Sequence, residues 1–185
     1  MIHDIRCFFG NFDLKRKSRH LKRDRRIHNF STAATAGIIF VCRNEEEFQA
    51  VKEFKQFLEG ESIRCDVVGY VSDKVVPDHY LLRQGFSFFC QKDLTWYFRP
   101  RTAFTDEFAS KRFDLLFDLS LRELFPVKYI VSLSPASYKI GRYGEAHPYD
   151  LMIDIKENPS VNYLIEQVRR YLSILHTRAS VVHSV

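Results

Sequence analysis

The sequence predicts an α/β fold: a three-layer, Rossmann-like domain with a mostly parallel sheet of about five or six strands, preceded by a basic helical arm. Two observations predict the layered sheet. Short, continuous apolar runs recur along the chain, as in strands that are buried on both faces, and segments with helical periodicity alternate with them. A third observation, the concentration of positive charge near the N-terminus, predicts the arm.

Residues 1–30 carry the positive charge of the chain. The 185 residues include 28 Lys and Arg against 23 Asp and Glu, which gives a net charge of +5. Residues 1–30 hold nine of the basic and three of the acidic residues, a net +6, so residues 31–185 carry −1. Eight of the basic residues fall within twelve positions: Lys15, Arg16, Lys17, Arg19, Lys22, Arg23, Arg25 and Arg26.

This basic stretch contains no Gly or Pro and is compatible with a helix. Upstream, an apolar stripe recurs at spacings of three or four residues: Ile2, Ile5, Phe9 and Phe12. Such an arm can lie on an anionic membrane surface, bind the phosphates of a nucleic acid, or dock its stripe on the body of its own domain. Arginine favours phosphate contacts and phenylalanine favours membrane insertion, so both partners stay open.

The body, residues 31–178, begins with a βαβ unit. The apolar run 36–42 predicts a strand that is buried on both faces. Asn44 can cap a helix that has an acidic first turn and ends at Gly60. The run 63–71 predicts the second strand.

Strands and helices continue to alternate after this unit. The segment 93–100 has no clear pattern, and residues 179–185 are predicted as a flexible tail. Further strands are predicted at 86–90, 113–119, 136–141 and 149–155.

Two more helices are predicted from local start signals. Ser120 and Glu123 have the spacing of a capping box, which predicts a helix from there to about Ser134, with Pro126 in the first turn or two. Pro159 fits the first position of the last helix.

Several function classes are excluded by what the sequence lacks. No apolar run is long enough to span a bilayer and the N-terminus has no signal-peptide cleavage pattern, so we expect a cytoplasmic protein. Neither nucleotide-binding fingerprint occurs, and we expect no cofactor. Four scattered cysteines predict reduced thiols and no zinc site. Among them, Cys42 lies beside Arg43 where a thiol can be activated, although a buried structural cysteine is the preferred interpretation.

Two predicted strands share one pattern, aromatic-Asp-Leu-apolar-apolar-Asp, at 113–118 and 149–154. The second Asp lies near the carboxyl end of each strand, where open α/β sheets bind ligands. Asp118 is therefore the first candidate for a ligand site, together with Ser120; the alternative is that Asp118 only accepts loop amides and caps the helix. A magnesium ion between Asp118 and Asp154 would need a strand order that brings them together, so no metal is predicted.

Two other segments are candidates for binding. Arg142 lies between two glycines after a predicted strand, where a guanidinium can meet the phosphate or carboxylate of a small anionic ligand; the glycines also fit a simple turn. The segment 96–101 places three adjacent aromatic residues beside two arginines and can stack bases, although packing at the edge of the core explains it equally.

The segments 113–120, 138–144 and 149–156 resemble a family of small uncharacterised bacterial proteins, and the likeness extends over most of the chain, including the basic arm. Residues 113–144 are also similar, more faintly, to part of the N-terminal domain of heptosyltransferase-type glycosyltransferases. The first resemblance implies a fold and no function. The second implies shared architecture, and no catalytic residue is carried over from it.

Together these observations predict a non-catalytic, cytoplasmic binding domain whose basic arm contacts an anionic partner, either a nucleic acid or a membrane surface. The alternative is a small-molecule enzyme or a ligand sensor that uses the carboxyl edge of the sheet around Asp118, Ser120 and Arg142.

Overall fold

The protein folds around one sheet of six strands, all of them parallel, with the strand order β3-β2-β1-β4-β5-β6. The computed structural model describes residues 2–144 and 148–175, so the predicted tail at 179–185 lies outside the described residues. The strands are β1 (Thr35–Val41), β2 (Arg64–Tyr70), β3 (Ser87–Phe89), β4 (Leu115–Asp118), β5 (Tyr138–Arg142) and β6 (Leu151–Ile153).

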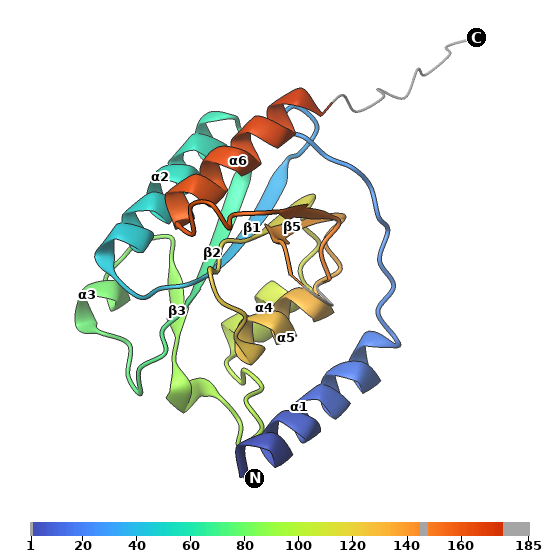
Figure 1. Cartoon of the computed structure of the whole chain (residues 1–185), viewed down its shortest axis with the longest axis vertical. Helices are drawn as coiled ribbons and strands as arrows, with labels where there is room; N and C mark the ends of the chain where they lie inside the picture. The colour runs from blue at the N-terminus through green and yellow to red at the C-terminus, as the bar shows by residue number, and fades with distance from the viewer. Residues whose placement is uncertain (1, 145–147, 176–185) are drawn as a thin grey trace.

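Helices cover both faces of this sheet, which confirms the predicted Rossmann-like architecture (Figure 1). Buried side chains form one core cluster on each face, because alternate residues of the central strands point to opposite sides. One face carries α2 and α6, and the other carries α4 and α5, with α1 packed on the outside of α5. The helices are α1 (Ile2–Ser18), α2 (Glu45–Gly60), α3 (Asp78–Leu81), α4 (Ala103–Ser110), α5 (Phe125–Leu133) and α6 (Val161–Ile174).

Local signals placed some helix starts correctly and others wrongly. The side chain of Asn44 accepts a hydrogen bond from the Glu47 amide and caps α2, as predicted, and Pro126 lies in the first turn of α5. The predicted capping box at Ser120 is wrong: the Ser120 amide donates to Asp118, and α5 begins only at Phe125. The last helix begins at Val161 rather than at Pro159, because the Ser160 side chain is its cap.

The basic stretch of the arm is helical only in its first part. Helix α1 ends at Ser18, and residues 19–34 run without helix along the edge of the domain to β1. Arg23 fixes this segment to the body: its guanidinium donates to Asp150 and to the carbonyl oxygens of Ala136 and Ser137. The basic stretch from Lys15 onward therefore does not form one continuous helix.

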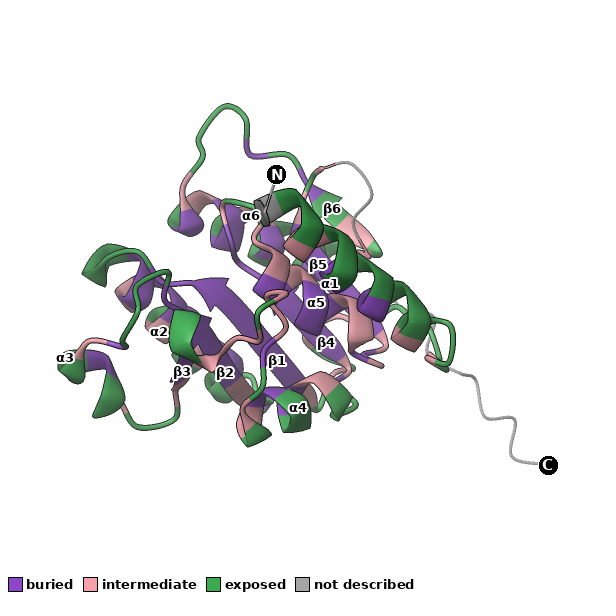
Figure 2. Cartoon of the chain, turned by 90° about the horizontal axis from the view of Figure 1, so that it is seen from below, coloured by how far each residue is buried: buried purple, intermediate pink, exposed green. Residues whose placement is uncertain are grey.

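The apolar stripe of α1 is largely exposed, although the Phe9 ring contacts that of Trp96 in the body. Ile5, Phe9 and Phe12 are exposed, and the outward side of the helix is exposed along its length (Figure 2). The helix packs through Gly10, Asp13 and Leu14 instead. For Ile5 and Phe12 the expectation that the stripe docks on its own domain is therefore wrong, and the side chain of Ile2 lies outside the described residues. None of the helices in the part of the chain that the structure describes is both long and apolar enough to cross a membrane.

Candidate functional site

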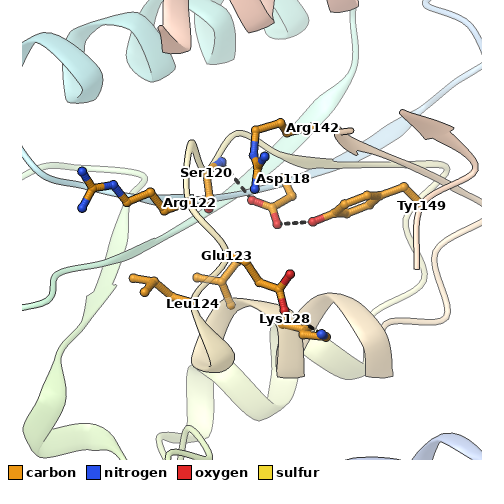
Figure 3. Close-up of a pocket in the computed structure, with 9 residues that line it drawn as sticks. Asp118, Ser120, Arg122, Glu123, Leu124, Lys128, Arg142 and Tyr149 are labelled. Carbon is orange, nitrogen blue, oxygen red and sulfur yellow. Dashed lines mark hydrogen bonds and ion pairs between the residues drawn. The ribbon is translucent and has the colours of Figure 1, made fainter. Parts of the chain in front are cut away.

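The carboxyl ends of β4 and β5 bring the three predicted ligand residues together. Asp118, Ser120 and Arg142 line one small pocket, as Figure 3 shows. The side chains of Asp118, Arg142 and Tyr149 converge there, whereas Arg122 extends away from them. The pocket is completed by the loop after β4 and the first turn of α5: Glu123, Leu124, Val127 and Lys128.

Asp118 organises the pocket through two hydrogen bonds. Its Oδ1 accepts from the Ser120 amide at 2.9 Å, and its Oδ2 accepts from the Tyr149 hydroxyl at 2.5 Å. Burial and the adjacent carboxylate of Asp118 raise the pKa of Tyr149 far above its ordinary value, so this phenol stays protonated and donates. Sequence reasoning missed Tyr149, because its neighbourhood depends on β5 lying between β4 and β6.

The Tyr149 ring reaches Asp118 across Gly141. A Cβ atom at position 141 would lie 2.6 Å from Tyr149 Cζ, closer than side-chain atoms approach one another. The glycine after Ile140 therefore has a packing role, which the turn interpretation of this glycine did not anticipate.

The structure separates the two carboxylates that were considered for a metal. β5 lies between β4 and β6, and Asp154 follows β6 in an exposed loop, where it accepts from the Lys156 amide at 3.0 Å. Within the described residues, no cluster of three or more His, Cys, Asp or Glu side chains has a geometry that could hold a metal ion.

The cysteines show no sign of activation. All four are free, and Cys42 and Cys90 are buried. Burial raises the pKa of Cys42 to about 11 and that of Cys65 to about 12, which disfavours a reactive thiolate. The proximity of Arg43 does not lower the Cys42 pKa, because Arg43 pairs with Glu47.

The eight basic residues of the arm fall into two groups. Several are held by the body or by a neighbouring carboxylate: Lys17 by Asp13 and Tyr129, Arg16 by Asp13, Arg23 and Arg25 by Asp150, and Arg26 by Asp24. Over the described ranges, 2–144 and 148–175, the others make no ion pair: Lys15, Arg19 and Lys22.

The side of α1 that faces the body combines the buried Leu14 and Gly10 with polar contacts. Arg6 donates to the carbonyl oxygen of Trp96, and the Tyr129 hydroxyl donates to Asp13 at 2.6 Å. Burial alone would raise the pKa of Asp13, but the Tyr129 hydroxyl and the charge of Lys17 lower it below its ordinary value. The carboxylate is thus ionised and holds the helix on α5.

The outward side of α1 is apolar. Phe8 and Phe12 are 67% and 62% exposed, and the ring of Phe9 lies 5.2 Å from that of Trp96, which is itself 56% exposed. We call this surface the apolar face; it consists of Ile5, Phe8, Phe9, Phe12 and Trp96. The basic residues Lys15, Arg16 and Arg19 follow it at the C-terminal end of the helix.

Comparisons with known proteins give one match. Residues 6–175 match the model of a family described as a family of unknown function (DUF6913). No curated protein and no solved structure matches the chain, so the fainter resemblance to heptosyltransferase-type enzymes finds no support.

Proposed function

The chain belongs to the DUF6913 family, whose function is unknown, and we propose that it is a non-catalytic binding domain that docks on an anionic membrane surface through α1. The observation that carries the proposal is the orientation of this helix, with its polar side against α5 and its apolar face toward solvent. A helix that serves only to cover its own domain buries its apolar side.

The composition of this surface fits the boundary between lipid headgroups and acyl chains. Amphipathic helices at membranes bury Phe, Trp and aliphatic side chains about 5–10 Å deep, while Lys and Arg contact anionic headgroups. The apolar face supplies three Phe, one Ile and one Trp. Lys15 and Arg19 supply exposed cations at its C-terminal end, and the exposed Lys22 follows in the segment after the helix.

A nucleic acid fits the same surface less well. Proteins that bind single strands place cations along a groove beside the stacking rings, so that the phosphate backbone follows the bases. Here the flanks of the aromatic stretch hold Asp4 and Asn11. Arg6 is engaged by the Trp96 carbonyl oxygen and the Phe98 ring, and the other cations of α1 gather at its C-terminal end. Ile5, at the N-terminal end of the surface, has no ring on which a base can stack.

The proposal places the domain on the cytoplasmic side of a membrane. The cytoplasmic leaflet carries anionic lipids, and each basic residue near its surface contributes about 1 kcal/mol of attraction. Two kinds of contact would then hold the domain on the membrane: basic residues at the headgroups and inserted aromatic side chains. Neither of them spans the bilayer.

Sedimentation with lipid vesicles tests this proposal. The full chain is expected to bind vesicles of mixed phosphatidylglycerol and phosphatidylcholine, and Phe8→Ser/Phe12→Ser to weaken binding by at least about tenfold, because each buried Phe contributes roughly 1.5–3 kcal/mol. Both side chains are exposed, so the substitution leaves the core intact. Leu81→Ser/Leu82→Ser is the matched control, since these leucines are also exposed but belong to α3 and the residue after it.

Two outcomes would contradict the proposal. One is equal vesicle binding by the α1 variant and the α3 control. The other is absence of vesicle binding together with tight, arm-dependent binding to a mixed RNA pool, with an affinity that falls steeply with salt by a log-log slope of about −0.7 to −0.9 per phosphate contact.

A further inference from the structure

We propose that the pocket at the carboxyl end of β4 binds an oxyanion, the phosphate or carboxylate group of a small ligand. This site is separate from the apolar face of α1, so neither proposal depends on the other. The argument rests on which polar groups in the pocket already have partners and which do not.

The acceptors that line the pocket are satisfied. Asp118 receives hydrogen bonds from the Tyr149 hydroxyl and from the Ser120 amide. Glu123 accepts from Lys128 Nζ at 2.6 Å. A ligand that brought further donors would compete with these protein donors for the same carboxylates.

Hydrogen-bond donors in the pocket lining, in contrast, remain available to a ligand. Ser120 is only 6% exposed and lines the pocket, and within the described residues its Oγ has no hydrogen-bond partner, which is costly for a buried hydroxyl. Arg142 points into the pocket and, in the same part of the chain, donates to the Tyr143 carbonyl oxygen at 3.2 Å and to no other acceptor. Across 2–144 and 148–175, no carboxylate pairs with this guanidinium.

The N-terminus of α5 adds main-chain donors to the same wall. The nine-residue helix has no side-chain cap, because its cap position is Leu124. The Lys128 amide makes the first helical bond, to Leu124 O at 3.0 Å, so the amide of Val127 in the pocket lining is left without an intrahelical acceptor. The Val127 amide and the helix dipole at this end favour an anion, while Pro126, before it, has no N–H to donate.

Charge and size narrow the ligand further. Lys128 is paired with Glu123 and Arg122 points away, so among the described residues Arg142 is the cation of the lining that remains available to a ligand. The enclosed volume is about 10 Å³, which admits one water-sized group. One oxygen of the oxyanion therefore enters beside Ser120, and the rest of the ligand lies at the mouth near Arg142.

Titration of the full chain with inorganic phosphate and, separately, with acetate tests the inference, with amide shifts read by NMR and chloride used to hold the ionic strength constant. At least one anion is expected to shift the Ser120 and Val127 amides saturably. Arg142→Gln should weaken binding by about tenfold and Ser120→Ala by about fivefold, as for loss of a charged and a neutral hydrogen bond. Arg122→Gln, which removes the same charge from a side chain that points away, should change the affinity by less than about twofold.

The two anions separate the two ligand chemistries. Saturation by phosphate alone would assign a phosphoryl group, and saturation by acetate alone a carboxylate. Absence of saturable shifts with both anions would overturn the inference. So would equal weakening by Arg142→Gln and Arg122→Gln, because the response would then reflect net charge and not the pocket. The amide spectrum of each variant shows directly that it is folded.

Discussion

Individual aspartates hold loop segments and strand ends in place by accepting hydrogen bonds. Asp114 accepts from the amides of Ala34 and Thr35 at 2.9 Å and so fixes the start of β1. Burial by itself raises the pKa of Asp114, but these donors lower it below its ordinary value. Asp150 accepts from the Lys139 amide at 2.8 Å and from Arg23. The first Asp of each repeated pattern is therefore structural.

The sequence predicted that these aspartates lie on strands or at their ends, but not what they bind. The partners of Asp114 and Asp150 are far away along the chain and are set by the strand order. The helix start that the capping-box pattern predicted at Ser120 is wrong for a related reason. Asp118, two residues earlier, accepts the Ser120 amide and so delays the start of α5.

Lys139 is a buried residue whose ionisation is expected to make stability depend on pH. It lies on β5, is 2% exposed, and its Nζ donates to the Val131 carbonyl oxygen at 2.7 Å. Burial, with a smaller contribution from the nearby charge of Arg23, lowers its pKa from 10.5 to about 7. The folded protein thus releases this proton at a lower pH than the unfolded chain does.

This difference predicts how stability varies with pH. Below about pH 7 the lysine is protonated in both states and the full cost of burying its charge is present; between pH 7 and 10.5 the unfolded chain binds more protons, so stability rises with pH. Relative to Lys139→Met, the free energy of unfolding of the wild type should rise on the order of 3 kcal/mol between pH 7 and pH 10.

Urea denaturation at a series of pH values measures this difference. Lys92→Met is the control, because it removes the same charge from an exposed position. If the free energy of unfolding of the wild type ran parallel to that of Lys139→Met over this pH range, burial would not lower the pKa of Lys139.

At the scale of elements, sequence reasoning described α1 only in part. The spacing of Ile5, Phe9 and Phe12 identified an apolar side, but periodicity does not say which side meets the body. The body offers polar partners to this helix, Tyr129 on α5 and the Trp96 carbonyl oxygen, and both are distant in sequence. The polar side therefore docks.

Helix α4 was not predicted, although its start signal is present. The Thr102 side chain accepts from the Thr105 amide at the N-terminus of Ala103–Ser110. The helix has only eight residues. It follows the aromatic segment 94–100, in which Phe98 has a positive φ of 66°. Short helices of this length contribute little periodic signal.

Close contact at Gly10 gives a prediction for the docking of α1. A Cβ atom there would lie 2.6 Å from the Tyr97 carbonyl oxygen and 2.7 Å from Phe125 Cζ. Although Ala is the better helix former, Gly10→Ala should lower the free energy of unfolding by on the order of 1–2 kcal/mol, because the helix must move off the body.

Gly60→Ala is the matched control for this prediction. Gly60 is also helical, at the end of α2, but a Cβ atom there would have no neighbour within 4 Å. It should leave stability unchanged or raise it by up to about 1 kcal/mol. Equal stability of the two variants in urea denaturation would mean that α1 does not pack closely on the body.

At the scale of the whole molecule, the sequence was sufficient for the architecture. Buried apolar runs alternating with helical patterns predicted a mostly parallel sheet, and all six strands are parallel. The strand order could not be read from these runs, because it depends on which helices cross each face. That order decides the candidate pocket, since it sets β4 beside β5 and so places Arg142 next to Asp118.

The distribution of charge is also a property of the whole molecule. Within the described residues, five of the eight clustered basic residues pair with carboxylates, either Asp13 and Asp24 of the arm itself or Asp150 of the body. The arm is therefore held on the domain with few unpaired cations and is not a free polycation. What distinguishes the surface of the molecule is instead the apolar face of α1, which lies at the outer edge, away from the sheet (Figure 1).

Trp96 provides the most direct measurement of the proposed membrane contact, because it is the only tryptophan of the chain and lies on the apolar face against Phe9. On addition of phosphatidylglycerol vesicles its fluorescence should shift to shorter wavelength, and lipids brominated on their acyl chains should quench it, as for a side chain about 5–10 Å deep. Unchanged emission and absence of quenching, at lipid concentrations that sediment the protein, would contradict docking through α1.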